Sequence, residues 1–147
     1  MVVDPTSPAG AAVTYTATAN DNVDGSVPVS CTPASGSMFA IGTTTVNCSA
    51  TDAHGNSATG SFSVTVRSAS QIASDLVAAT EDPFQQGTHL LQNAQRSISA
   101  PHTQAACGQL QAFINQVAAQ AGKQLADDVA ASWIASADAA RVALGCN

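Results

Sequence analysis

Charged side chains are scarce in this chain of 147 residues. Only 10% of its residues are charged, and four Lys and Arg stand against ten Asp and Glu, which gives a net charge of −6. Nucleic acid is not expected as a partner, because binding to phosphates depends on clustered basic side chains. The same acidity disfavours an anionic membrane surface. Membrane insertion is not expected either, since no apolar run approaches the roughly 20 residues of a membrane span.

Motifs for catalysis and for zinc binding are also missing. The sequence has no Cys-x-x-Cys pair and no Gly-x-Ser-x-Gly nucleophile motif. We expect His54, His89 and His102 to be solvated or capping side chains, because no catalytic constellation surrounds them. The adjacent pairs Glu81–Asp82 and Asp127–Asp128 cannot face each other across a substrate, as glycoside hydrolysis requires. We therefore expect that the chain is not an enzyme.

The composition is typical of an extracellular protein. Ser, Thr, Ala and Gly are abundant, and Lys occurs once. The first residues do not have the basic, apolar and small-residue regions of a signal peptide. We therefore expect Met1 to be an introduced start, and the segment to come from a longer protein that is secreted or displayed at a cell surface.

Four cysteines, two in each half of the chain, predict one disulfide per half. Cys31 and Cys48 fall on the inward faces of two predicted strands, so a bond between them is geometrically plausible. Cys107 lies near the start of one predicted helix and Cys146 at the end of the next, which brings them together in an antiparallel hairpin. Disulfides imply an oxidising compartment. The alternative is four buried free thiols.

Apolar and polar residues alternate up to about residue 67. The runs with this period of two are Val13–Ala19, Val27–Cys31, Val46–Ala50 and Phe62–Val66. A period of two with β-branched residues predicts half-buried strands, and polar turn segments separate them. Short, evenly spaced strands favour an all-β, immunoglobulin-like antiparallel sandwich over residues 1–67.

Four motifs in this half carry a family resemblance. They are Asp21-Asn22-Val23-Asp24-Gly25, Cys31-Thr32-Pro33-Ala34-Ser35-Gly36-Ser37, Phe39-Ala40-Ile41-Gly42-Thr43-Thr44-Thr45-Val46 and Ala50-Thr51-Asp52-Ala53-His54-Gly55-Asn56. Their order resembles that of a hyalin repeat (HYR) domain, an immunoglobulin-like extracellular module. Ala40 departs from the family, which often has Pro there, and this departure concerns only a local turn. The resemblance implies extracellular adhesion or a spacer role and brings no catalytic residues.

After Ser68 the apolar residues recur at steps of three and four. They form two stripes: Cys107, Leu110, Ile114, Val117 and Ala121, and then Leu125, Val129, Trp133, Ala137, Ala140 and Leu144. This period predicts amphipathic helices, and shorter ones are expected around Ile72–Ala79 and Leu90–Ile98. No predicted helix is apolar all round, so each needs a partner. We expect a small all-α antiparallel bundle over residues 68–147.

Two helical segments, Ala105–Val117 and Ala139–Cys146, resemble the C-terminal module called FIMAH. This module occurs in bacterial secreted and surface proteins. The match is good over residues 103–147 and weak over 69–100. The resemblance implies an accessory module and no established chemistry.

The acidic turns of the first half suggest a metal site. Asp21, Asp24, Asp52 and Asn56 offer oxygen ligands of the type that Ca²⁺ prefers, and they would meet if both turns lay at one end of the sandwich. The alternative is that Asn, Asp and Gly are simply turn formers. No EF-hand spacing is present, and no other cofactor is expected.

These features predict a non-catalytic accessory segment of a larger secreted or surface protein, of bacterial origin, acting in adhesion, display or spacing. One alternative is a self-assembling extracellular subunit, because low charge and a Thr-rich sheet permit lateral pairing. Another is a carbohydrate-binding module of a glycoside hydrolase, for which only Phe39 and Phe84 are expected outside a core. The expected partners are other domains of the parent protein, a surface protein or polysaccharide, or further copies of the chain.

Overall fold

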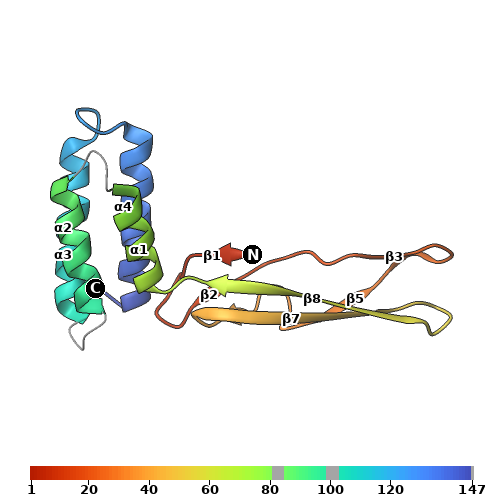
Figure 1. Cartoon of the computed structure of the whole chain (residues 1–147). Helices are drawn as coiled ribbons and strands as arrows, with labels where there is room; N and C mark the ends of the chain where they lie inside the picture. The colour runs from red at the N-terminus through yellow and green to blue at the C-terminus, as the bar shows by residue number, and fades with distance from the viewer. Residues whose placement is uncertain (81–84, 99–102, 147) are drawn as a thin grey trace. The chain divides into compact units, whose positions relative to one another are not determined.

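Strands occupy the first half of the chain and helices the second (Figure 1). The structure, a computed structural model, describes residues 1–80, 85–98 and 103–146, with no side chains described at 85–87. Two units are present: Met1–Val3 with Ala9–Val66, and Asp4–Pro8 with Arg67–Asn147. The chain is therefore an all-β unit followed by a four-helix unit, as the two hydrophobic periods predict.

The β unit is built around one long hairpin. Its strands are β1 (Val2–Val3), β2 (Ala11–Ala12), β3 (Ala19–Asp21), β4 (Gly25–Val27), β5 (Val29–Thr32), β6 (Met38–Phe39), β7 (Gly42–Thr51) and β8 (Ser57–Val66). The main sheet has the order β1-β8-β7-β5, and β2–β6 and β3–β4 form two small sheets. All pairs are antiparallel except β1 and β8, which run parallel. The expectation of a purely antiparallel arrangement is corrected at this one pair.

The core of the β unit lies between the main sheet and the segments opposite it. Val46, Val64 and Val66 of β7 and β8 are fully buried and pack in one cluster with Val13 and Phe39. The period of two predicts this correctly, because alternate residues of a strand point to opposite faces. The Thr and Ser residues between these valines lie on the other face of the sheet.

The run Val13–Ala19 keeps its predicted alternation of buried and exposed residues, but only Ala19 belongs to a strand. The backbone of Val13 exchanges hydrogen bonds with Gly36 and Ser37. The backbone of Tyr15 bonds the hydroxyl of Ser35 in both directions, at 2.8 Å each. Contacts with the turn that contains Ser35, Gly36 and Ser37 therefore take the place of pairing with a neighbouring strand, and the segment stays extended.

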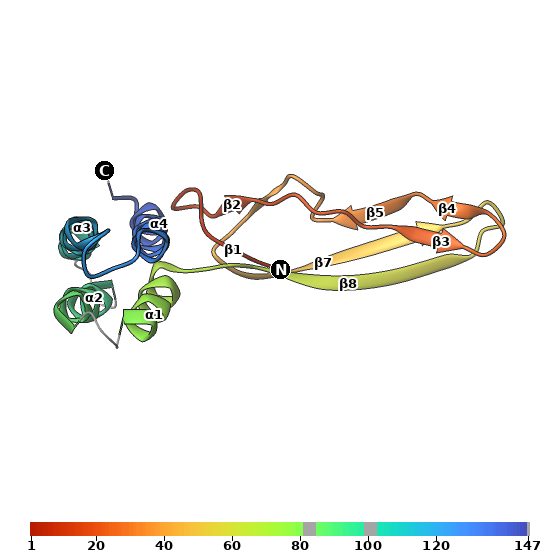
Figure 2. The ribbon, with the colours of Figure 1, turned by 90° about the horizontal axis from the view of Figure 1, so that it is seen from above.

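The helical unit contains α1 (Ala69–Thr80), α2 (Gln85–Ile98), α3 (Thr103–Gln120) and α4 (Asp127–Leu144). Each helix packs against two others, so the four form a closed bundle that Figure 2 shows end-on. Its core includes Ile72, Leu91, Leu110, Phe113 and Trp133. Val129 is 37% exposed, so its predicted place in the apolar stripe of α4 is wrong. None of the described helices is long and apolar enough to span a membrane.

Each unit contains one disulfide, and the pairing is the predicted one. Cys31 and Cys48 lie directly opposite each other on β5 and β7, with Cα atoms 4.0 Å apart. Cys107 and Cys146 join α3 to the end of α4, with Cα atoms 5.7 Å apart. Gly145 ends α4 in the left-handed conformation, which turns the chain so that Cys146 can reach α3.

Shortening Leu110 tests the helical core. Leu110 is fully buried among the four helices, so Leu110→Ala is expected to lower the free energy of unfolding by about 2–5 kcal/mol. The exposed Val129→Ala is the control and is expected to cost under about 1 kcal/mol. Chemical denaturation followed by the fluorescence of Trp133 measures both, and equal losses would contradict this description of the core.

Candidate functional site

The turn between β7 and β8 is held by one carboxylate. Asp52 Oδ1 accepts hydrogen bonds from the backbone N–H groups of His54 at 2.9 Å and Asn56 at 2.7 Å. Its other oxygen accepts from the side-chain amide of Asn56 at 2.7 Å. Gly55, with φ of +87°, supplies the left-handed residue that this tight turn needs.

The turn between β3 and β4 has a similar local construction. Asp21 Oδ1 accepts from the backbone N–H groups of Val23 at 2.8 Å and Asp24 at 2.9 Å. This is the usual way in which Asp stabilises a turn, by bonding backbone groups two and three residues later. The side chain of Asp24 is thereby left to point outward from the turn.

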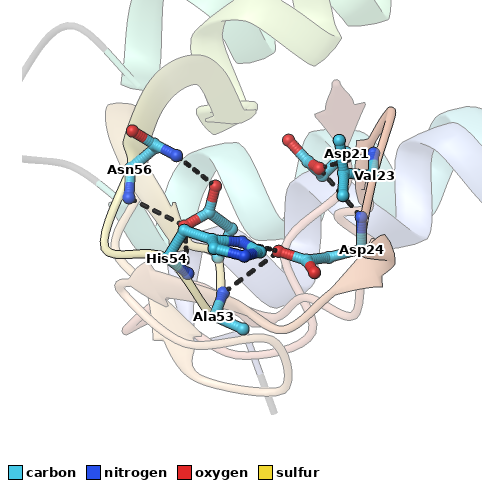
Figure 3. Close-up of polar contacts among 7 residues, drawn as sticks. Asp21, Val23, Asp24, Ala53, His54 and Asn56 are labelled. Carbon is cyan, nitrogen blue, oxygen red and sulfur yellow. Dashed lines mark hydrogen bonds and ion pairs between the residues drawn. The ribbon is translucent and has the colours of Figure 1, made fainter.

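Asp24 connects the two turns (Figure 3). Its Oδ2 lies 3.0 Å from His54 Nδ1 and 3.3 Å from the backbone nitrogen of Ala53. Since an ionised carboxylate only accepts hydrogen bonds, His54 donates through Nδ1. The His54 side chain is 65% exposed and that of Asp24 24% exposed, so this hydrogen bond contributes little stability and mainly joins the two loops.

The hydrogen bonds to Asp52 also shift its titration. The side-chain hydrogen bond from Asn56 lowers the pKa of Asp52 below its ordinary value, partial burial opposes this, and the backbone N–H groups of Asn56, His54 and Gly55 lower it further. The charged form of Asp52 is therefore the form that the turn stabilises.

The metal hypothesis named Asp21, Asp24, Asp52 and Asn56. Among the described residues the structure instead groups Asp24, Asp52 and His54, whose candidate ligand atoms all lie within 4.8 Å of one another. Asp21 is engaged in its own turn, and the amide of Asn56 donates to Asp52 rather than facing the cluster with its oxygen. Sequence reasoning missed His54, because its contact with Asp24 depends on two turns 30 residues apart.

A shallow cleft of about 150 Å³ opens beside these turns, between the two layers of the β unit. Asp21, Asp52 and Asn56 line its polar side, and Ala19, Val27, Ala50 and Ala58 line the apolar side. Small side chains at this end of the sandwich leave the layers incompletely filled. The site thus combines an exposed hydrogen-bonding rim with a small apolar hollow.

The other candidates lie elsewhere. Phe39 is 1% exposed and belongs to the β core, so the prediction of an exposed aromatic there is wrong. Phe84, His102, Glu81 and Asp82 lie outside the described residues. His89 is an exposed residue of α2, and Asp127 and Asp128 occupy the first turn of α4, where their charge suits the helix dipole.

A disulfide-bonded β-sandwich module followed by a disulfide-closed helical bundle is the class of protein that this architecture defines. Residues 5–66, nearly the whole β unit, match the family model of the HYR domain. The described motifs of the two turns and of β7 lie inside this match. No curated protein and no solved structure matches the chain. The β unit is therefore similar to HYR domains, a non-catalytic family of adhesion type.

Removing the Asp52 carboxylate tests the turn. Because its pKa is lowered in the folded chain, its stabilising effect is complete above pH 3.8, the ordinary value, and is lost as the pH falls through the lower folded pKa. Asp52→Ala is expected to remove this pH-dependent part and to speed amide exchange at Asn56, with Asp128→Ala as the control. Unchanged exchange at Asn56 in Asp52→Ala would contradict the role of the carboxylate.

Calcium binding at the cluster stays a prediction, and the contacts define its test. A calcium ion on Asp24 would take the oxygen that His54 now contacts. We therefore expect Asp24→Asn to abolish any calcium affinity, and His54→Ala to preserve or raise it. Isothermal titration with calcium, repeated with a chelator, measures this affinity, and binding that survives Asp24→Asn would exclude the cluster as its site.

Proposed function

We propose that the chain is a non-catalytic accessory segment of a larger secreted or cell-surface bacterial protein, and that it acts in adhesion, display or spacing. The observation that carries this proposal is the HYR match over residues 5–66. HYR domains suggest an extracellular module of adhesion type. The helical unit would be the accessory part, in line with its resemblance to FIMAH modules.

The disulfides support the extracellular setting. Both bonds form in the structure, and no described cysteine is free. By loop length, the bond between Cys31 and Cys48 is expected to stabilise its unit by about 3 kcal/mol and that between Cys107 and Cys146 by about 4 kcal/mol. Such bonds persist in oxidising compartments. A module exposed to proteases and shear outside the cell gains most from this restraint on its unfolded chain.

The exposed loops at the end of the β unit are the preferred place for a binding function. Loops on a rigid scaffold commonly carry recognition, and the Asp24–His54 contact connects two such loops. A polysaccharide-binding role has less support, because Phe39 is buried and the rings of Tyr15 and Phe62 pack edge-on at 4.9 Å. Association of the chain with itself is a separate alternative.

Adhesion is tested with beads that carry the oxidised chain at a known density. We expect saturable attachment to surfaces coated with extracellular proteins or polysaccharides, and a loss of attachment with Asp24→Ala, because it removes the contacts that join the two loops. Lys123→Ala in the helical unit is the control and is expected to attach normally. A spacing role instead predicts no attachment, together with a terminal tag that stays accessible on cells displaying the chain. Chains that neither attach nor present the tag would overturn the proposal.

A further inference from the structure

A histidine lies among the acidic side chains of the end turns of the β unit. Asp24 belongs to the turn between β3 and β4, whereas Asp52 and His54 belong to the turn between β7 and β8. One carboxylate oxygen of each aspartate and one ring nitrogen of His54 all lie within 4.8 Å of one another. Figure 3 shows the ring of His54 directed at Asp24. The two turns together therefore offer a mixed set of oxygen and nitrogen donors.

This donor set differs from that of a calcium site. Ca²⁺ takes roughly six to eight oxygen ligands, whereas the cluster consists of two carboxylates and an imidazole. Zn²⁺ binds imidazole nitrogen and carboxylate oxygen in tetrahedral geometry, and a water molecule completes sites in which the protein supplies three ligands. The donors that the fold brings together therefore suit Zn²⁺ better than Ca²⁺.

The spacing of His54 and Asp24 fits a shared ion. His54 Nδ1 lies 3.0 Å from Asp24 Oδ2, and two ligands of a tetrahedral zinc ion lie about 3.3 Å apart, because each bond is about 2.0 Å long. Zinc would take the place of the proton between these atoms, and neutral His54 would then carry its proton on Nε2. Asp52 is held by hydrogen bonds from Asn56 and from the backbone of His54, as carboxylate ligands of metals commonly are.

The charges of the β unit point independently to a cation as the ligand. The first Lys or Arg of the sequence is Arg67, so residues 1–66 contain neither. Asp21, Asp24 and Asp52 therefore have no Lys or Arg of their own unit to pair with. The helical unit differs, because its Asp75 and Asp138 each pair with an arginine. A divalent cation at the end turns would balance carboxylates that the β unit itself leaves without a basic partner other than His54.

We propose that Asp24, Asp52 and His54 bind a zinc ion, with water in the remaining position, and that the ion joins the two turns. The exposed contact between Asp24 and His54 contributes little stability by itself, so an ion shared by both turns would hold them together more strongly. No described cysteine is free to compete for the metal as a thiolate. The inference goes beyond the adhesion role and does not depend on it.

Zinc titration of the oxidised chain, made without a histidine tag, tests the site. The sequence has three histidines, so the double variant His89→Ala/His102→Ala keeps His54 as its only imidazole. We expect the native chain and this variant to bind a single zinc ion equally well, and His54→Ala to raise the dissociation constant at least about tenfold. Isothermal titration calorimetry with zinc chloride measures the affinity, and circular dichroism shows that each variant is folded. A native chain that binds no zinc, or a folded His54→Ala that binds it as well, would overturn the proposal.

Nuclear magnetic resonance tests direct coordination and the choice of metal. We expect zinc to move the ¹⁵N resonance of His54 Nδ1 strongly and that of His89 little, and an equal concentration of calcium chloride to leave the zinc bound. Asp24→Asn is expected to weaken the zinc response, whereas the exposed Asp128→Asn is the control and should not. An unmoved His54 resonance, or displacement of zinc by calcium, would contradict the site. The adhesion role is unaffected by either failure, because the attachment of beads is a separate measurement.

Discussion

The pairing of β7 with β8 is the constraint on which the β unit depends. These ten-residue strands pair along their whole length, from Gly42 opposite Val66 to Thr51 opposite Ser57. The ladder fixes which face each residue occupies, since a slip of β8 by one residue would turn Val64 and Val66 out of the core. It also places Cys48 opposite Cys31 on β5 and sets the position of the turn that Asp52 closes.

The helical unit is organised by a different constraint, the way its last helix ends. The N–H of Gly145 bonds the carbonyl of Val142 at 3.0 Å, and the N–H of Cys146 bonds that of Arg141 at 3.0 Å. This left-handed ending satisfies carbonyls that a helix terminus otherwise leaves without partners. It reverses the chain direction in one residue, so Cys146 reaches Cys107 while Trp133 and Ala137 stay in the core.

Local periodicity predicts most of the buried residues of the long elements, with Val129 of α4 as an exception, but it does not predict which segments pack against them. The alternation from Val13 to Ala19 correctly gives the inward face, yet a turn and the hydroxyl of Ser35 take the place of a neighbouring strand. Phe39 lies in a short segment without a period, so nothing local shows that it fills the core. The Asp24–His54 contact depends on two distant turns meeting, which composition cannot reveal. The parallel pairing of β1 could not be predicted from the sequence either, because two valines do not indicate the direction of a strand.

The distribution of charged residues limits the kinds of contact that the main sheet of the β unit can make. None of the strands β5, β7 and β8 contains a charged residue, so the main sheet offers only backbone groups, hydroxyls and the amide of Asn47. The acidic groups of the β unit instead gather at its end turns, in Asp21, Asp24 and Asp52. The charged groups of the β unit therefore lie in the turns. Contacts along the sheet depend instead on hydrogen bonds and shape complementarity. Salt screens interactions between exposed charges but weakens such contacts little. Any contact that this sheet makes would therefore depend little on ionic strength.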